Sequence, residues 1–322
     1  MKKVQWGVLG TADIARGATI PSMLQAESCS LYAIAGRNPE KARAWQETFG
    51  FEKSYGSYDK LLADPAVEAV YIPLPNNLHC EWSIRALQAG KHVLCEKPLA
   101  MNEEQVVRMF QAAEENHVFL MEAFAYLHSP FVAAVKKELE SGAVGEIRYV
   151  ESGFIGGLRP DTDIRLQRET GGGAMYDLGC YPLSMVLWML GREPEEIKAT
   201  AQFSPRGVDL FTTVLLLYQN GPVAALDCGM LADAGRLDRF HILGTEGEIF
   251  SPVQFNQAGE IPYTVVRNGK AETKTVLCPH NYSLEVEQLS RCVRGEAVPH
   301  IPRDFSRMTA RVMDRILAEI GW

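Results

Sequence analysis

Short apolar runs alternate with amphipathic stretches along the first third of the chain. The apolar runs have the length and composition of buried strands, and they comprise Val4–Leu9, Leu31–Ala35, Ala69–Ile72 and His92–Cys95. The amphipathic stretches carry apolar residues at helical spacing, and they comprise Ile14–Ala26, Glu40–Phe49, Leu78–Ala89 and Glu103–Asn116. This alternation predicts a doubly wound parallel sheet, to which Val118–Met121 adds a further strand.

The pattern changes near Ala123. Helical spacing returns at about Ser129–Ser141, near Met175–Leu190, and in the closing stretches Ser283–Val293 and Asp304–Ile320. Other runs are closely spaced and favour an antiparallel sheet, namely Ile147–Ile155, Ile197–Phe203, Phe211–Tyr218, Val223–Asp227, Phe240–Leu243 and Tyr263–Val266. We therefore predict two domains, an α/β domain at residues 1–122 and an α+β domain at residues 123–322.

Composition is typical of an enzyme acting on small molecules rather than of a nucleic-acid-binding protein. The 322 residues carry a net charge of −8, which opposes electrostatic binding to nucleic acid. The sequence starts without an apolar secretory stretch and has no uninterrupted apolar run of membrane-spanning length. Its seven cysteines are scattered among apolar neighbours, as expected of reduced thiols, so we expect a cytoplasmic protein without disulfides.

A strand-turn-helix motif opens the first predicted domain. In Gly7-Val8-Leu9-Gly10-Thr11-Ala12-Asp13-Ile14-Ala15, Gly10 supplies the tight turn, and the start of the following helix can bind a pyrophosphate. Alanines replace the second and third glycines of the usual pattern, so the motif alone also fits a plain strand-helix corner. Its place at the start of the alternating series favours dinucleotide binding.

The end of the second predicted strand indicates which dinucleotide binds. Ala35-Gly36-Arg37-Asn38 lacks the Asp or Glu that would bind the ribose hydroxyls of NAD. Arg37 can stack on adenine and neutralise the 2′-phosphate of NADP, although solvated loop arginines are also common. We therefore predict NADP, with NAD as the second option.

After the third strand, the chain leaves the sheet through Pro73 and Pro75 and enters a helix with Asn76 or Asn77 as its cap. Because this turn lies at the ligand-facing edge, Asn76 can hydrogen-bond the nicotinamide ribose and His79 can reach the substrate; helix capping and packing are the alternatives. The neighbouring His and Cys residues lack the spacing of a zinc site, so we expect no metal.

Two segments carry the candidate chemistry. Glu96-Lys97-Pro98 follows the fourth strand, at the edge where parallel sheets bind their ligands. Later, Gly171-Gly172-Gly173 leads into a helix on which Asp177 and Tyr181 stand four residues apart and so share a face; a buried Tyr satisfied by its neighbouring Asp is the structural alternative. If both segments line one cleft, an ammonium, a carboxylate and a phenol converge beside the nicotinamide, which suits removal of a hydroxyl proton during hydride transfer.

Over essentially its whole length, the chain resembles the glucose-fructose oxidoreductase, inositol dehydrogenase and rhizopine-catabolism (Gfo/Idh/MocA) family. Glu96-Lys97-Pro98, Met121-Glu122-Ala123-Phe124 and the Gly172–Tyr181 segment carry the match. The tyrosine at position 181 is similar to the branch of NADP-dependent D-xylose dehydrogenase and dimeric dihydrodiol dehydrogenase, whereas the inositol branch has histidine at this position. The resemblance implies a Rossmann domain that binds the dinucleotide and a second domain that binds the substrate and contains a large, mostly antiparallel open sheet. It also implies a homodimer or higher homo-oligomer through that sheet.

The resemblance also implies an activity and a site. It implies hydride transfer between NADP and a hydroxyl or carbonyl carbon of a sugar, cyclitol or vicinal diol, with Lys97, Tyr181 and Asp177 as catalytic residues. Asp177 would orient the sugar hydroxyl or Lys97, and the sequence leaves open whether Lys97 or Tyr181 takes the proton. Together with the motifs above, the resemblance predicts these cofactor contacts: Gly10, Thr11, Ala12, Asp13, Ile14, Arg37, Asn38, Pro73, Asn76, His79, Glu96 and Lys97.

Other functions on the same fold stay open at this point. A non-catalytic dinucleotide-sensing regulator would use the same first domain, although the joint presence of Lys97, Asp177 and Tyr181 favours an enzyme. A redox-assisted glycosidase, which oxidises and re-reduces a sugar with a tightly held cofactor, is a third option. We expect four charged residues of the second domain to be solvated in a loop rather than to bind substrate hydroxyls, namely Arg159, Asp161, Asp163 and Arg165.

Overall fold

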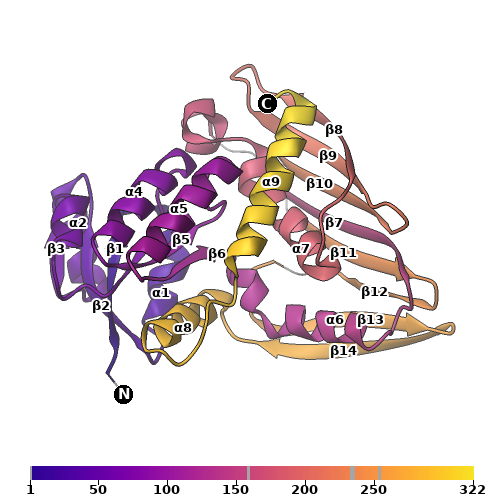
Figure 1. The fold of residues 1–322 in the computed structure, drawn as a ribbon, viewed down its shortest axis with the longest axis horizontal. Helices are drawn as coiled ribbons and strands as arrows, with labels where there is room; N and C mark the ends of the chain where they lie inside the picture. Colours follow the sequence, from indigo (N-terminus) through magenta and orange to yellow (C-terminus); the bar gives the residue numbers. More distant parts are fainter. Residues whose placement is uncertain (1, 158–159, 233–235, 253–254) are drawn as a thin grey trace. The chain divides into compact units, whose positions relative to one another are not determined.

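The computed structural model describes residues 2–157, 160–232, 236–252 and 255–322, which form two compact units (Figure 1). The first unit comprises Met1–Ala125 and His280–Arg307, and the second comprises Tyr126–Pro279 and Met308–Trp322. Each unit has its own sheet, of six strands in the first and eight in the second. Arg159, one of the loop residues named above, lies outside the described residues.

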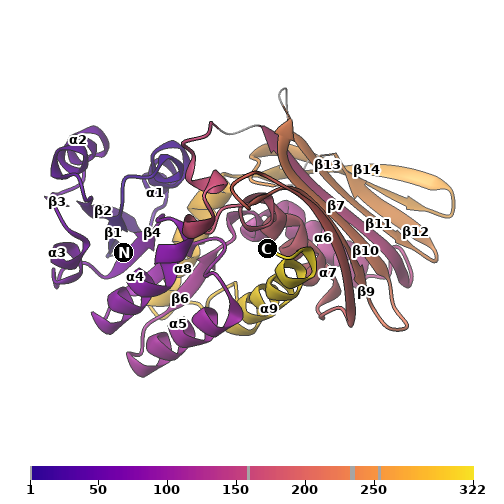
Figure 2. The ribbon, with the colours of Figure 1, turned by 90° about the horizontal axis from the view of Figure 1, so that it is seen from above.

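The first unit contains a parallel sheet with the strand order β3-β2-β1-β4-β5-β6. Its strands are β1 (Val4–Leu9), β2 (Cys29–Ala35), β3 (Lys53–Tyr55), β4 (Ala69–Ile72), β5 (His92–Glu96) and β6 (Leu120–Ala123). Its helices are α1 (Ile20–Met23), α2 (Pro39–Phe49), α3 (Tyr58–Leu62), α4 (Asn76–Gln88), α5 (Glu103–Glu115) and α8 (Asn281–Val293). Helices α4 and α5 pack side by side on one face, and α1 and α8 pack on the other (Figure 2). The winding of the sheet reverses between β1 and β4, where sheets of this kind bind ligands.

This sheet confirms the predicted doubly wound architecture. Strand β4 is buried at every position, as expected of a strand covered on both faces. The sequence pattern missed β3 because Lys53–Tyr55 is short and contains no apolar run, and it placed the start of β6 at Val118 instead of Leu120. The predicted first helix is a π-helical turn at Ala15–Thr19 followed by one α-helical turn, since Pro21 has no N–H to donate to the preceding turn.

The second unit contains a sheet with the strand order β14-β13-β12-β11-β7-β10-β9-β8. Its strands are β7 (Ile147–Gly157), β8 (Glu196–Phe203), β9 (Asp209–Leu217), β10 (Val223–Ala232), β11 (Leu237–Gly244), β12 (Gly247–Ser251), β13 (Gly259–Arg267) and β14 (Lys270–Cys278). Neighbouring strands are antiparallel except β7 and β10, which confirms the predicted mostly antiparallel sheet. The sequence pattern missed β12 and β14; β14 exposes most of its residues and so has no apolar face to detect.

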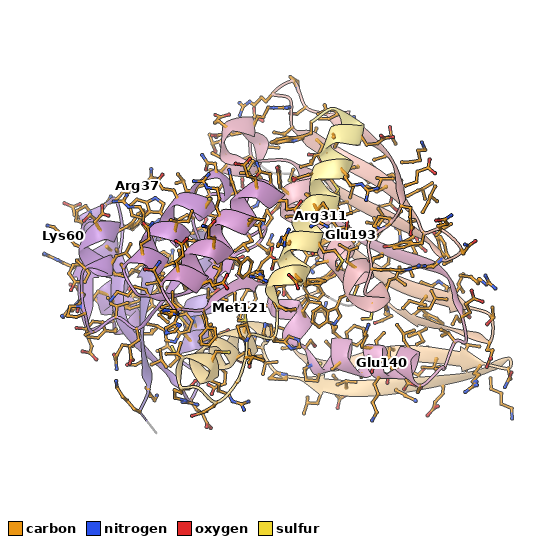
Figure 3. All side chains as sticks on the ribbon, viewed as in Figure 1. Arg37, Lys60, Met121, Glu140, Glu193 and Arg311 are labelled. Carbon is orange, nitrogen blue, oxygen red and sulfur yellow. The ribbon has the colours of Figure 1, made fainter. Side chains whose placement is uncertain are left out.

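Helices cover one face of this second sheet. Helices α6 (Pro130–Glu140) and α7 (Cys180–Leu190) lie on that face, and α9 (Arg303–Ile320) runs from the first unit into the second (Figure 2). Arg311 of α9 pairs with Glu193 at 2.7 Å within the second unit (Figure 3). Side chains alternate along the strands, so that in β9 Val214 and Leu216 are buried while Leu215 between them is exposed. The sheet therefore has one packed face and one open face.

The segment His280–Arg307 returns to the first unit. Helix α8 packs against β2 and β5, and its Ser290 accepts a hydrogen bond from Trp6 Nε1 at 3.0 Å. The sequence pattern assigned this segment to the second domain, because an amphipathic helix does not reveal which core it joins. The roles predicted for residues 123–322 as a substrate-binding and oligomerisation domain stay predictions.

Candidate active site

Lys97 begins the loop that follows β5 in the first unit, and the peptide bond between Lys97 and Pro98 is cis. The Glu96 carboxylate accepts the backbone N–H of Lys97 at 3.2 Å and the hydroxyl of Tyr71 at 2.6 Å. Burial, with the Glu96 carboxylate beside it, holds the pKa of Tyr71 well above its usual range, so the Tyr71 hydroxyl stays a donor. Glu96 thus fixes the start of the loop from the interior of the fold, and its predicted contact with a cofactor stays a prediction.

His79 joins two turns of the first unit. Its Nδ1 lies 2.9 Å from the carbonyl oxygen of Pro98, and its Nε2 lies 2.7 Å from that of Leu74. Burial lowers the pKa of His79 to about 4, so the ring is neutral near pH 7 and its single N–H serves one carbonyl at a time. The side chain is 0% exposed and both nitrogens face backbone carbonyls, which supports the packing alternative, and the predicted contact with the cofactor or substrate stays a prediction. Its role is to connect the turn after β4 to the lysine loop.

Two more buried carboxyl groups interact with Glu96. Glu122 of β6 accepts the backbone N–H of Leu99 at 2.9 Å, so it holds the lysine loop from a second strand. Burial raises the pKa of Glu122 to about 7, an effect that Glu96 reinforces and Lys97 opposes. Glu285 of α8 is fully buried, and in the part of the chain that the structure describes neither of its carboxyl oxygens has a hydrogen-bond partner. Burial and the nearby Glu96 hold the pKa of Glu285 well above its usual range, which favours its neutral form.

The turn after β1 has the backbone shape that a dinucleotide requires. Gly10 has a φ of 118°, a conformation that favours glycine, and its N–H donates to the carbonyl of Ala35 at 2.8 Å. A Cβ at Gly10 would lie 3.0 Å from the Leu74 side chain, so the turn has no room for a larger residue. This turn has no Cβ at Gly10 and lies where the winding of the sheet reverses, so it fits a pyrophosphate. The next four predicted contacts are partly or fully exposed, namely Thr11, Ala12, Asp13 and Ile14.

Two cationic side chains lie at the end of β2. Arg37 is exposed (Figure 3), and it interacts with the hydroxyl of Tyr58 in α3. Lys41, on the first turn of α2, donates from Nζ to the carbonyl of Thr11 at 2.9 Å, which brings its charge back to the turn after β1. Asn38 caps α2, because its Oδ1 accepts the backbone N–H groups of Glu40 and Lys41 at 3.0 Å each. Sequence reasoning missed Lys41, although the capping signal Asn38-Pro39 places it on the first helical turn.

The turn after β4 differs from its prediction at the helix start. Helix α4 begins at Asn76 with Pro75 as its N-cap residue, and no side chain caps it. The predicted cap by Asn76 or Asn77 is therefore wrong, since both residues already lie inside the first helical turn. Pro73 is buried and Asn76 is half-buried, and their contacts with a cofactor stay predictions.

A glycine turn introduces the second segment. Gly173 has a φ of 113°, and a Cβ there would clash with the Asp209 carboxylate. The same carboxylate accepts the backbone N–H of Met175 at 2.8 Å, which fixes the start of a π-helical turn, Met175–Gly179. These glycines are therefore more than a flexible lead-in to the helix, because close packing against Asp209 requires at least the third of them.

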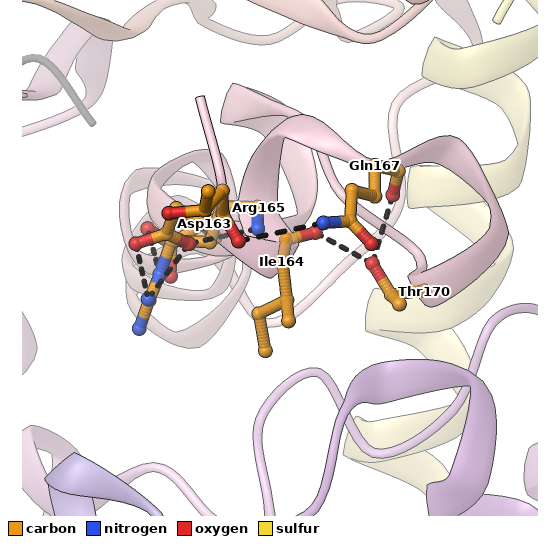
Figure 4. Close-up of polar contacts among 7 residues, drawn as sticks. Asp163, Ile164, Arg165, Gln167 and Thr170 are labelled. Atoms are coloured by element: carbon orange, nitrogen blue, oxygen red, sulfur yellow. Dashed lines mark hydrogen bonds and ion pairs between the residues drawn. The ribbon is translucent and has the colours of Figure 1, made fainter. Parts of the chain in front are cut away.

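Asp177 lies in this π-helical turn and pairs with Arg165. Arg165 Nε is 2.9 Å from Asp177 Oδ2. Arg165 Nη1 is 3.3 Å from the Asp163 carboxylate (Figure 4). Burial opposes the charge of Arg165, but the two carboxylates outweigh it and raise its pKa. The expectation that Asp163 and Arg165 are merely solvated is therefore wrong, whereas Asp161 is exposed as expected. Arg165 holds the Asp177 carboxylate, whose side chain is 13% exposed.

Tyr181, in the first turn of α7, stands in an aromatic cluster of the second unit. Its ring centroid lies 5.3 Å from that of Phe154, 5.3 Å from that of Phe255 and 5.6 Å from that of Tyr126. The side chain is buried, and its hydroxyl oxygen accepts a hydrogen bond from Asn256 Nδ2 at 3.0 Å. No sequence signal marks Asn256, which is 75 residues away along the chain. The cluster fixes the ring, and the asparagine fixes the hydroxyl.

Three further properties bear on the class of site. Among the described ranges, no group of three His, Cys, Asp or Glu side chains gathers where it could hold a metal ion. Within the same ranges, no helix is both long and apolar enough to cross a membrane. All seven cysteines are buried free thiols, and burial raises the pKa of Cys292 to about 11.

Both units match models of known domains. Residues 4–124 match the oxidoreductase family with an NAD-binding Rossmann fold, and residues 132–250 match the GFO/IDH/MocA C-terminal domain. The chain belongs to the GFO/IDH/MocA oxidoreductase family. The resemblance that the sequence motifs indicated is thereby confirmed, as is the presence of a Rossmann domain.

Relatives within the GFO/IDH/MocA family span the whole chain. It is 34% identical to D-xylose 1-dehydrogenase (NADP(+)) 2 of Haloferax volcanii, over 99% of this chain and 98% of that protein. It is 32% identical to trans-1,2-dihydrobenzene-1,2-diol dehydrogenase of Xenopus laevis, over 98% of each. The structure of KijD10, a 3-ketoreductase from Actinomadura kijaniata in complex with NADP and TDP-benzene, is similar with a TM-score of 0.93 and 31% identity, covering 99% of this chain and 98% of that one.

Proposed function

We propose that the protein is an NADP-dependent oxidoreductase that transfers hydride between NADP and a hydroxyl or carbonyl carbon of a sugar, cyclitol or vicinal diol. Membership of the GFO/IDH/MocA family and the named activities of the relatives support this proposal. The observation that carries it is the pair of anchored groups, the Lys97 loop held by buried side chains and the Tyr181 hydroxyl held by an amide. A protein that only sensed a dinucleotide would have no need of a tyrosine hydroxyl held in place.

The first unit would hold the dinucleotide through the turns after β1 and β2. The bare turn at Gly10 accommodates a pyrophosphate, and Arg37 and Lys41 supply positive charge for the 2′-phosphate of NADP. An arginine offers two parallel hydrogen bonds to a phosphate, while the lysine acts as a point charge. The carbonyl of Thr11 keeps the Lys41 ammonium beside this turn.

We assign the proton chemistry to Tyr181, Lys97 and Asp177, the catalytic residues that the family resemblance implies. When bound, the nicotinamide ring exchanges a hydride with the substrate carbon. As the carbon loses hydride, the attached hydroxyl loses its proton to the Tyr181 oxygen, and in reduction the same proton returns. A free tyrosine hydroxyl has a pKa of about 10, so a base working near neutral pH needs its phenolate stabilised, and the Lys97 ammonium is the cation that we assign to that task. Asp177, held by Arg165, orients a substrate hydroxyl.

The proposal is tested by following nicotinamide absorbance while the protein is mixed with aldopyranoses, inositols and cyclic diols, each with NADP+ and with NAD+. We expect turnover with at least one of these classes and a lower KM for NADP+. Arg37→Ala and Lys41→Ala should each raise the KM for NADP+ about tenfold and leave that for NAD+ unchanged, whereas the exposed Arg43→Ala of the same helix should change neither. Cofactor binding without turnover of any compound would favour a sensor, and glycoside cleavage with retained cofactor would favour a redox-assisted glycosidase.

We further infer a cytoplasmic homo-oligomer that associates through the open face of the second sheet. On that face one row crosses neighbouring strands and comprises Leu215, Ala225, Glu151, His241 and Phe250. Of these, Leu215 is 40% exposed and Phe250 is 37% exposed. Exposed apolar side chains on an open sheet face support association. A mass of a single chain, measured by light scattering, would contradict the proposed homo-oligomer. Cell fractionation tests the proposed cytoplasmic location.

A further inference from the structure

Asn256 is the residue whose role the proposed function leaves open. Its Nδ2 is 3.0 Å from the Tyr181 hydroxyl oxygen, and it follows Phe255, whose ring packs on Tyr181. The Asn256 backbone has a φ of 53°, in the left-handed region that asparagine tolerates better than most residues. Its Oδ1 is buried and has no hydrogen-bond partner within the described ranges. The amide therefore makes its described side-chain hydrogen bond to Tyr181 alone.

The direction of this hydrogen bond matters for a tyrosine that exchanges a proton. An amide N–H that donates to a phenol oxygen interacts more strongly with the phenolate than with the neutral phenol, so it favours the ionised form. An amide turned by 180° presents its oxygen instead and can accept the proton of a neutral phenol. Because no described group holds Oδ1, such a rotation breaks no other hydrogen bond of the Asn256 amide. One side chain can thus serve both protonation states of Tyr181.

Within the second unit, the Asn256 amide is a direct polar neighbour of the Tyr181 hydroxyl. Aromatic rings from three segments pack against the Tyr181 ring, and one of them, Tyr126, directs its hydroxyl to Ser184 and to the Tyr181 carbonyl. Charged groups near the cluster are paired: Arg236 lies 4.2 Å over the Phe154 ring and bonds to Asp238. On the π-helical turn before α7, Asp177 pairs with Arg165.

We propose that Asn256 is a positioning residue that holds the Tyr181 hydroxyl and stabilises its ionised form through the amide N–H. This inference rests on the proposed role of Tyr181 as the group that exchanges the substrate proton. It adds Asn256 as a residue that acts through Tyr181. Asn256 lies in the connection between β12 and β13, 75 residues further along the chain than Tyr181.

The test compares Asn256→Asp and Asn256→Gly with the parent protein, all saturated with NADP+. Asp has the same shape but lacks the donor and brings a negative charge, and Gly removes the side chain while tolerating the left-handed backbone. Asn268→Asp and Asn268→Gly are matched controls, because Asn268 has a φ of 52° at an exposed turn between β13 and β14. Ionisation of Tyr181 is read from tyrosinate absorbance across a pH titration, as the difference from Tyr181→Phe. Oxidation of D-xylose with NADP+ is followed over the same pH range.

We expect the Tyr181 midpoint to rise by about one to two pH units in Asn256→Gly, and further in Asn256→Asp, because a hydrogen bond to a charged group is lost. The pH at which D-xylose oxidation becomes fast should rise equally, while both Asn268 variants keep the parent midpoint. A midpoint that stays in place in both Asn256 variants would overturn the inference, whether or not D-xylose is oxidised. Full activity of Tyr181→Phe would instead contradict the proposed role of Tyr181 in the reaction. The titration would still measure the effect of Asn256 on the Tyr181 hydroxyl.

Discussion

The Lys97 loop and the Tyr181 segment hold their candidate groups in different ways. Around Lys97, buried ionisable side chains bind backbone atoms: Glu96 accepts the Lys97 N–H, Glu122 accepts the Leu99 N–H, and His79 contacts the Pro98 carbonyl. Around Tyr181, contacts run between side chains, from aromatic rings to the Tyr181 ring and from the Asn256 amide to its hydroxyl. In the first case the path of the backbone is fixed, and in the second the side chain itself.

This difference predicts how the two regions respond to substitution. A change beneath the lysine loop moves backbone, so it should alter stability and cofactor binding together with catalysis. A change beside Tyr181 leaves the backbone in place and should alter proton affinity or substrate orientation. The buried acids near Glu96 add a second contrast, because burial raises the pKa values of Glu122 and Glu285, so stability in the first unit depends on pH.

The largest effect is expected when the reacting groups themselves are removed. Lys97→Met should lower turnover by about 10²-fold or more, as expected for lost general acid-base help, and leave NADP binding within a few-fold of the parent. Tyr181→Phe should act similarly. Turnover with the best sugar or diol and NADPH binding by fluorescence check both parts. An equal loss of binding and turnover in Lys97→Met would make Lys97 an anchor of the cofactor.

The next largest effect concerns stability near Lys97. Burial raises the pKa of Glu122 from 4.5 to about 7, so between these values the folded protein holds a proton that the unfolded chain releases. The contribution of Glu122 is thus fully present below pH 4.5 and is lost as pH rises through about 7, a change of about 3 kcal/mol at 1.36 kcal/mol per unit. Urea unfolding across this range should show a fall relative to Glu122→Gln, which does not titrate. Parallel curves for the two proteins would show that Glu122 ionises normally.

How much of this could be read from the sequence differs between the two regions. The strand-helix alternation predicted the parallel sheet, and position alone placed Lys97 at its ligand-facing edge. The groups that fix the loop were beyond that reasoning, because His79 and Glu122 come from two other elements, and only packing brings their side chains to the loop. For the same reason the sequence left open whether His79 faces a ligand or packs, and its position on the inner face of α4 turns it into the core.

The second region was predictable in composition but not in conformation. The glycines, Asp177 and Tyr181 stand close together in sequence, so the motif was visible, yet a continuous helix was expected where a π-helical turn precedes α7. Arg165 and Asn256 carry no pattern of their own. Arg165 was expected to be solvated because charged loop residues usually are, and its pairing with Asp177 depends on the glycine turn that folds the loop back.

A smaller effect, spread over binding and turnover, is expected at His79. His79→Leu removes the connection between Leu74 and Pro98, so we expect about a tenfold rise in the KM for NADP+, about a tenfold fall in kcat, and a loss of about 1–3 kcal/mol of stability from unsatisfied buried carbonyls. His92→Leu is the matched control. His92 accepts the Phe119 N–H at 3.0 Å at the opposite end of β5, so its loss should destabilise the protein without changing either kinetic constant. Equal kinetics in the two variants would contradict a role for His79 in holding the site.

The smallest effect, and the sharpest check on the Tyr181 side of the comparison, is expected at Arg165. The Arg165 side chain is 37% exposed, so its pair with Asp177 is partly screened and is worth about 0.5–1 kcal/mol. Arg165→Met should therefore lower kcat/KM for the sugar or diol about two- to fivefold, chiefly through KM, with NADP binding unchanged because no backbone moves. Arg168→Met is the control, since Arg168 bonds to the Gly207 carbonyl rather than to Asp177. A loss of NADP binding in Arg165→Met would mean that this region, like the lysine loop, fixes the backbone, and the distinction between the two regions would then fail.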